Sequence, residues 1–510
     1  MPPVSILFAN NTIPLTEPCA APEFFADLAL DQIVAAVIAG REGYDLAPFF
    51  ALPLHDREGI VYRQEIFRDL DDPGLVSALQ SFAEAMRNMR AQLALADRLR
   101  YPHQQERWFL EGVATYCIAV LALTEAIGMA GRCTSAGSAA FAAYLAEYAA
   151  SPPFIALQEQ TQRLREELAS LRYCLHIDGL LVQCLPYGGQ ADYSIEIDEI
   201  FARFRQGSTG AYTFTFQEVD EMNQVEARIL DLVAELFPDL FAALTEYQAA
   251  HADFLDPGVA RFDREIQVYL AWLEYMARLT RAGLVFCLPE VTEDKEIHAE
   301  QTVDLALANR LVREGIVPVA NDFHLAGRER ILVITGPNQG GKTTFARMFG
   351  QLHYLACLGL PVPGTRAQLF LFDRLFTHFE REEHLTDLRG KLQDDLVRIH
   401  SILEQATPRS LLVINEMFAS TTFQDALDLS QRIAARLVAL DMLCVWVTFI
   451  DELSRLGEQT VSLMSTVVLD NPAQRTFKII RQPADGRAHA VSLAERHRLT
   501  YAAITERMRR

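Results

Sequence analysis

The chain has 510 residues, half of them hydrophobic, which predicts two or more domains with sizeable cores. Its formal net charge of −21 at pH 7 excludes indiscriminate nucleic-acid binding, so any contact with DNA would need a local basic patch. Eight scattered cysteines without a C-x-x-C pair argue against a zinc site and a disulfide framework, and they are typical of a reducing cytoplasm.

The first part of the chain follows helical spacing. After an irregular stretch over residues 1–22, a helix is expected at 24–38, where glycines at 40 and 43 end it. Longer helices are expected at 75–100, 106–128, 139–150 and 154–170. The apolar stretch at 114–130 contains Glu125 and is too short and interrupted for a membrane span, so we expect a buried helix there.

The pattern changes over residues 171–216. Segments 172–177 and 180–185 read as two strands joined through Asp178-Gly179, a dipeptide typical of hairpins, and 193–197 predicts a third strand. A small β-containing element therefore interrupts the helices. Helical spacing then returns, with helices expected at 218–237 and 259–282.

From about residue 315 onward, strands and helices alternate, which is typical of a mostly parallel sheet covered by helices. Strands are expected at 331–334, 373–379, 410–415, 443–449, 467–469 and 477–480, and helices at 388–405, 423–440 and 492–510. The last of these helices is basic.

One motif in this region carries specific chemistry. Residues 336–343 match G-x-x-x-x-G-K-[ST], between an apolar run and a helical pattern. The backbone N–H groups of such a loop, and the N-terminus of the helix after it, bind phosphate oxygens. Lys342 would reach the β- and γ-phosphates and Thr343 would ligate Mg²⁺, so the motif predicts ATP and Mg²⁺. The nucleotide-binding residues expected from it are Gly336, Pro337, Asn338, Gln339, Gly340, Gly341, Lys342, Thr343 and Thr344.

A second group follows the apolar run at 411–414. Asn415 and Glu416 stand at the C-terminal end of the expected strand, where an open α/β sheet places catalytic groups. Glu416 is the predicted general base for the attacking water. Asn415 stands where such ATPases carry an Asp that steadies Mg²⁺ through water. Its amide can accept the same hydrogen bond without adding charge, so we expect weaker Mg²⁺ coupling and slower turnover.

These blocks resemble the MutS family of DNA mismatch-repair ATPases. The likeness rests on 335–344, 358–363, 373–377 and 406–427, in the family's order and spacing. The Gly-Pro-Asn-x-Gly-Gly-Lys form of the loop is much more specific than a bare phosphate loop. A weaker likeness covers 24–70, and the element at 171–216 sits where the family inserts its DNA clamp.

The resemblance implies a multi-domain architecture. An α-helical core and lever region would occupy 23–314, with a clamp-like β-containing insertion at 171–216, followed by an α/β P-loop ATPase domain of the ABC type at 315–510. It implies a homodimer in which each ATP lies between one subunit's phosphate loop and the other subunit's signature loop. ATP binding would close the dimer on DNA, duplex or branched, in repair or recombination. By the same resemblance, Gly390 is the signature residue that acts in trans.

Several positions depart from the family pattern. Gly390 replaces the signature serine and offers only its N–H, and Phe449 replaces a histidine after the next strand. These changes add to the expectation of slow hydrolysis. We find no N-terminal mismatch-reading module and no complete C-terminal dimerising helices, so base-level mismatch reading is not expected.

Two alternatives remain open. One is an ATP-gated scaffold that binds protein partners and no nucleic acid, which the −21 charge favours. The other is a generic or chromosome-structuring ABC-type ATPase, which would carry a Ser-Gly-Gly signature that we do not find.

Overall fold

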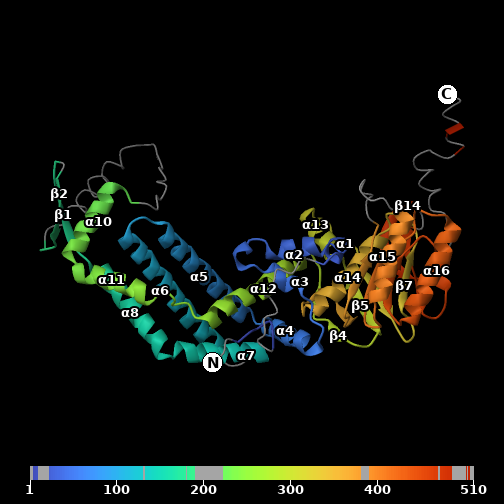
Figure 1. Cartoon of the computed structure of the whole chain (residues 1–510), viewed down its shortest axis with the longest axis horizontal. Helices are drawn as coiled ribbons and strands as arrows, with labels where there is room; N and C mark the ends of the chain where they lie inside the picture. The colour runs from blue at the N-terminus through green and yellow to red at the C-terminus, as the bar shows by residue number, and fades with distance from the viewer. Residues whose placement is uncertain are drawn as a thin grey trace. The chain divides into compact units, whose positions relative to one another are not determined.

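The computed structural model describes residues 4–9, 22–129, 132–179, 181–189, 222–380, 390–468 and 471–484, with Tyr501, Ile504 and Thr505 near the C-terminus (Figure 1). The chain divides into two compact units that interleave along the sequence. The helical unit comprises Met1–Val4, Asp72–Thr134 and Ala139–Asp263, and the sheet unit comprises Ser5–Asp71, Ser135–Ser138 and Arg264–Arg510. The predicted division at 1–22, 23–314 and 315–510 stays a prediction.

The helical unit contains the long helices that the sequence predicted, together with a further helix at Pro238–Ala250 that it did not predict. They are α5 (Pro73–Arg98), α6 (Pro102–Ile127), α7 (Ala136–Ala149), α8 (Pro152–Ser170), α10 (Gln224–Leu236), α11 (Pro238–Ala250) and the start of α12 (Pro257–Thr280). Asp72 caps α5 and Ser151 caps α8 through side-chain oxygens that accept backbone N–H groups. The helix expected from 218 begins later, because Asn223 and Glu226 form a capping box before α10.

The predicted hairpin is confirmed. β1 (Tyr173–Asp178) pairs antiparallel with β2 (Leu181–Pro186), and Gly179 takes a positive φ of 59° in the turn. The third strand predicted at 193–197 and most of the basic helix at 492–510 lie outside the described residues.

Helix α6 is long and apolar enough, by length and composition alone, to cross a membrane. However, 56% of its most apolar window is buried within the fold, as in the core helix of a globular domain. Tyr116 and Val120 are fully buried. These observations agree with the buried helix expected from the sequence.

The sheet unit is built on a six-stranded sheet in the order β10-β11-β12-β7-β13-β14. Its strands are β10 (Leu375–His378), β11 (Leu411–Asn415), β12 (Leu443–Val447), β7 (Ile331–Thr335), β13 (Thr460–Val468) and β14 (Asn471–Arg481). All neighbours pair in parallel except β13 and β14. The mostly parallel sheet is confirmed, although β13 begins earlier than the predicted strand at 467–469.

Helices cover this sheet. The helices α15 (Lys391–Gln405) and α16 (Phe423–Ala439) pack Ile399 and Leu437 into one apolar core with β7, β11 and β12. The helix α14 (Lys342–Cys357) also contacts β11 and β12. Because α14 follows β7 directly, its N-terminus lies at the C-terminal edge of the parallel strands, where ligands bind in such sheets.

A second sheet was missed in the sequence. It has the order β4-β9-β5-β6, from β4 (Glu290–Thr292), β9 (Arg366–Phe370), β5 (Ile297–Thr302) and β6 (Asn321–Leu325). A two-stranded pair, β3 (Phe286–Cys287) with β8 (Val362–Pro363), and a helix, α13 (Leu305–Arg313), accompany it. The strands are short, and β9 joins them from far along the chain, so local spacing did not reveal them.

The N-terminal part of the sheet unit is also helical, with α1 (Phe24–Asp27), α2 (Leu30–Ile38), α3 (Ala47–Ala51) and α4 (Arg57–Asp69). The helix predicted at 24–38 is broken, because Ala29 has a φ of 53°, in the left-handed region.

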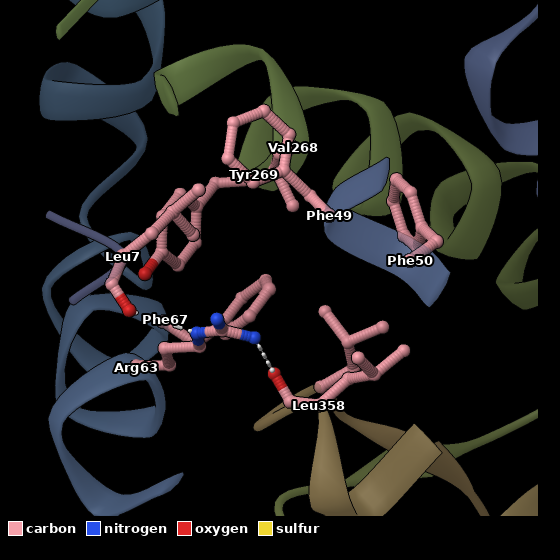
Figure 2. Close-up of a pocket in the computed structure, with 9 residues that line it drawn as sticks. Leu7, Phe49, Phe50, Arg63, Phe67, Val268, Tyr269 and Leu358 are labelled. Atoms are coloured by element: carbon pink, nitrogen blue, oxygen red, sulfur yellow. Dashed lines mark hydrogen bonds between the residues drawn. The ribbon is translucent and has the colours of Figure 1, made fainter. Parts of the chain in front are cut away.

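A buried arginine ties these helices to α14. The Nε of Arg63 on α4 donates to Leu7 O at 3.0 Å, and its Nη1 donates to Leu358 O at 2.9 Å, just past the end of α14 (Figure 2). Arg63 is only 3% exposed and borders a cavity of about 10 Å³ that Phe67 and Tyr269 also line. A buried cation is tolerated where polar groups satisfy it, and the C-terminal end of a helix is favourable for a positive charge.

We expect Arg63→Ala to lower the free energy of unfolding by about 3 kcal/mol, because two buried carbonyl oxygens would lose their donors and a void would form. Chemical denaturation followed by circular dichroism measures the loss. The matched control is Arg328→Ala, since the side chain of Arg328 is 81% exposed and forms a long ion pair of 3.8 Å with Glu458. Its loss should stay below about 0.5 kcal/mol, and equal losses in the two variants would contradict the role of Arg63.

Candidate functional site

The phosphate loop connects β7 to α14. Gly336 and Gly341 have φ angles of 108° and 92°, a conformation that residues with a Cβ rarely adopt. Gly340 is required for another reason, because a Cβ there would lie 2.2 Å from Ser465 Oγ. A side chain at position 336 or 340 would therefore collide with Ser465 on β13, and position 341 requires glycine for its positive φ.

Lys342 lies at the centre of this loop. Its Nζ donates to Gly336 O at 3.0 Å, to Pro337 O at 3.2 Å and to Asn338 Oδ1 at 3.1 Å, and the residue is 5% exposed. Burial lowers the pKa of Lys342, the carboxylate of Glu416 raises it, and the guanidinium of Arg475 lowers it. An anion beside the ammonium would stabilise the charged form, so the loop suits a phosphate group.

The two halves of the predicted site meet in the structure. The hydroxyl of Thr343 donates to Asn415 Oδ1 at 2.9 Å, although the residues are far apart in the sequence. A hydroxyl and an amide oxygen are hard oxygen groups of the kind that Mg²⁺ and its bound waters prefer. The residues therefore fit a magnesium ion held by Thr343, with Asn415 facing it through water.

Glu416 directly follows β11, and the backbone turns away from the strand at this residue. It has a φ of 54°, and its N–H donates to Val447 O at 3.0 Å. Its side chain reaches the same cavity as the phosphate loop. Strained backbone of this kind is concentrated at functional sites.

A cavity of about 670 Å³ unites these groups. Of the predicted residues, it is lined by Asn338, Gln339, Gly341, Lys342, Thr343, Thr344 and Glu416. Gly336, Pro337 and Gly340 belong to the same loop, and Asn415 is bonded to Thr343. The volume lies within the usual range for small-molecule sites.

The other side of the cavity was missed in the sequence. It is mostly apolar and is lined by Leu307, Arg310, Leu311, Ile316, Val317, Pro318, Val319, Asn321 and Phe477. Val317 and Phe477 are 62% and 51% exposed. A phosphate-binding end opposite an exposed apolar end fits a nucleotide, whose base needs an apolar face. The apolar run at 316–319 could have signalled this wall.

Phe477 could not have been found from sequence. Its φ is 58°, unusual for an aromatic residue, and its conformation is held by Asn321. The Nδ2 of Asn321 donates to Phe477 O at 3.2 Å, and its Oδ1 accepts from Ile479 N at 2.7 Å. Asn321 thus bonds to the carbonyl oxygen of the left-handed residue itself and to the N–H of the residue two positions later.

Two predicted positions lie apart from this cavity. Gly390 is exposed at the N-terminal cap of α15, with nothing within 4 Å of the place where a Cβ would stand. Phe449 is 49% exposed after β12. Neither lines the cavity formed by the described residues, and the in-trans role of Gly390 stays a prediction.

The site agrees with comparisons of the sequence. Residues 332–499 match the family model of MutS domain V. The chain carries the ATPase domain of the MutS family. MutS domain V thus spans the strand before the phosphate loop, the loop itself, and the strand that ends at Asn415.

Distant similarity to MutS proteins covers about half of the chain. The DNA mismatch repair protein MutS of Granulibacter bethesdensis is 28% identical over 49% of this chain and 27% of that protein. MutS of Thermotoga maritima is 25% identical over 54% of this chain and 34% of that protein. MutS of Zymomonas mobilis is 31% identical over 35% of this chain and 21% of that protein. The matched part therefore spans about a third of these relatives or less.

We expect Lys342→Ala to abolish saturable binding of a fluorescent ATP analogue with Mg²⁺, because the loop loses its only lysine ammonium and three hydrogen bonds. Titration followed by fluorescence anisotropy measures this. Lys295→Ala is the control, since Lys295 pairs with Asp441 in the same unit and is not among the described residues that line the cavity. ATP binding by Lys342→Ala at the parent affinity would exclude this loop as the phosphate site.

Proposed function

We propose that this protein binds ATP with Mg²⁺ in the cavity described above and hydrolyses it with Glu416 as general base. The supporting observation is the convergence of Lys342, the Thr343–Asn415 pair and Glu416 on one cavity with an apolar far wall. A match to an ATPase domain over the same residues supports the reaction class.

Each residue has a defined task in this mechanism. The backbone N–H groups of the loop and the N-terminus of α14 bind phosphate oxygens, while Lys342 binds between the β- and γ-phosphates. Mg²⁺, when bound, neutralises charge that develops on the phosphate oxygens. Thr343 would hold the ion, and Asn415 would accept a hydrogen bond from a water bound to it. Glu416 orients the attacking water and accepts its proton.

The dimer belongs to the same proposal. In the ABC-type arrangement that the family resemblance implies, Gly390 of one subunit would face the γ-phosphate bound by the other. The support for this from Gly390 is its exposed position at the N-terminus of α15, the end of a helix that favours an anion. The expectation of slow turnover from Asn415, Gly390 and Phe449 stays a prediction, as does a cytoplasmic location.

We further propose that ATP binding is coupled to clamping of DNA, duplex or branched. This rests on the similarity to proteins named DNA mismatch repair protein MutS and on a helical unit that carries the β1–β2 hairpin. The matched part covers only a minor share of those relatives, so a role in mismatch repair is a proposal as well.

A scaffold that binds a protein partner is the second candidate. The described part of the hairpin exposes apolar side chains, with Leu175, Ile177 and Leu181 at 41%, 66% and 57%. The described residues of its two strands include no lysine or arginine. A DNA contact needs cations near phosphates, whereas an apolar surface favours a protein.

We expect Glu416→Ala to bind ATP at close to the parent affinity and to lose at least about 100-fold in turnover, because the attacking water loses its base. Phosphate release under multiple turnover, together with a binding titration, separates the two effects. Glu404→Ala serves as control, since Glu404 is exposed on α15 with a side chain 67% accessible. Hydrolysis by Glu416→Ala at the parent rate would show that another group is the base.

A gel-shift titration with duplex, mismatched and branched DNA at low salt, with and without ATP, tests the choice between partners. The clamp predicts a shift that ATP changes and that weakens steeply with added salt. No shift on any of these DNAs would reject the clamp and favour the scaffold.

A further inference from the structure

A buried pair of ionisable side chains lies beside the turn that carries Glu416. His378, the last residue of β10, is 1% exposed, and the side chain of Asp395 on α15 is 10% exposed. His378 Nε2 lies 3.5 Å from Asp395 Oδ1. Neither ring nitrogen of His378 has a hydrogen-bond partner among the described residues. Because buried polar atoms are almost always paired, this pair needs an explanation.

Asp395 also contacts the turn after β11. Its Oδ2 accepts a hydrogen bond from the backbone N–H of Phe418 at 3.3 Å. Glu416 and Phe418 have φ angles of 54° and 63°, and Phe418 is fully buried. The left-handed conformation is unfavourable for residues that carry a side chain, and this turn contains two of them. Such a turn persists only where its surroundings determine it.

The turn is held at two N–H groups. The N–H of Glu416 donates to Val447 O on β12, and that of Phe418 donates to Asp395 on α15. The first bond comes from the sheet and the second from a side chain on a helix. We propose that Asp395, packed against His378, is a positioning residue that keeps the carboxylate of Glu416 directed into the nucleotide cavity. The inference rests on the proposed hydrolysis by Glu416.

The charges around the pair are consistent with this role. Burial and, after it, the positive charge of Arg398 lower the pKa of His378 to about 4, whereas burial raises the pKa of Asp395. Arg398 donates to Phe379 O at 3.0 Å, and Asp394 and Lys391 lie on the same helix. His378 is therefore neutral at pH 7 and carries one N–H that can donate to Asp395.

Through Asp395, helix α15 is bonded to the turn that carries Glu416 and Phe418. The helix begins directly after Gly390, and Asp395 lies on it. A movement of about 0.5 Å would bring the His378–Asp395 contact into hydrogen-bond range. A displacement at the N-terminal end of α15 is thereby passed through Asp395 to Phe418 and then to Glu416.

The test compares Asp395→Ala, Asp395→Asn and Asp394→Ala in the full chain. We expect Asp395→Ala to lower kcat for ATP by about tenfold or more, because the carboxylate of Glu416 would no longer be held in position to act on the attacking water. The Kd for ATP should stay within about twofold, since the phosphate loop is untouched. Asp395→Asn keeps an oxygen acceptor for Phe418 N–H and should retain kcat within about threefold. Asp394→Ala should leave kcat unchanged.

A double-variant cycle separates positioning from general weakening of the fold. If Asp395 acts through Glu416, then Glu416→Ala with Asp395→Ala should hydrolyse ATP no more slowly than Glu416→Ala alone. If the two losses multiply instead, the proposal is wrong. An equal loss of kcat in Asp394→Ala, or a parent kcat in Asp395→Ala, would also overturn it.

Two outcomes must be kept apart. If the parent protein shows no hydrolysis that depends on Glu416, the proposed function fails. If the parent hydrolyses ATP through Glu416 and Asp395→Ala matches it, only the positioning role fails. Should Asp395→Ala not fold, His378→Gln provides the second variant, since it keeps Asp395 and removes the imidazole. Its kcat should fall with an unchanged Kd for ATP, and a parent kcat would reject the pair.

Discussion

The sheet unit depends on one buried ammonium group. Lys342 is 5% exposed and is bonded to three oxygens of the loop that precedes it. These bonds close the loop around the charge, and the glycines at 336 and 341 allow the backbone to turn that tightly. A buried cation is costly unless oxygen atoms surround it, so the same interaction orders the loop and prepares it for an anion.

One departure from the family pattern, Asn415, changes the balance of charge in the site. Asn415 pairs with Thr343 through a neutral hydrogen bond, so the carboxylate usual at this position is missing. Burial lowers the pKa of Lys342, the carboxylate of Glu416 raises it, and Arg475 adds a second positive charge that lowers it. These charges favour an anion over a metal cation in the site. An anion would be attracted by both Lys342 and Arg475, whereas a metal cation would be attracted by the carboxylate of Glu416 alone.

Much of the catalytic end was predictable from sequence because its signals are local. The phosphate loop, the strand ending at Asn415 and the turn into Glu416 are contiguous motifs with fixed spacing, and the structure places them in one cavity. The apolar wall was not predictable, because it joins α13, the segment 316–319 and Phe477 from separate parts of the chain. The second sheet was not predictable for the same reason, since β9 pairs with strands that precede it by many residues. The left-handed backbone of Phe477 depends on Asn321, which no local pattern indicates.

Arg63 gives the phosphate-loop helix a second anchor. Helix α14 has 16 residues and is therefore about 24 Å long, with Lys342 at its start and the carbonyl oxygen that Arg63 binds just past its end. One end of this helix faces the nucleotide cavity, and the other is bonded to Arg63 of α4, which also bonds to Leu7 in the N-terminal segment of the chain. Because packed protein interiors transmit strain, we expect a displacement of the phosphate loop to be passed along α14 to its contact with Arg63.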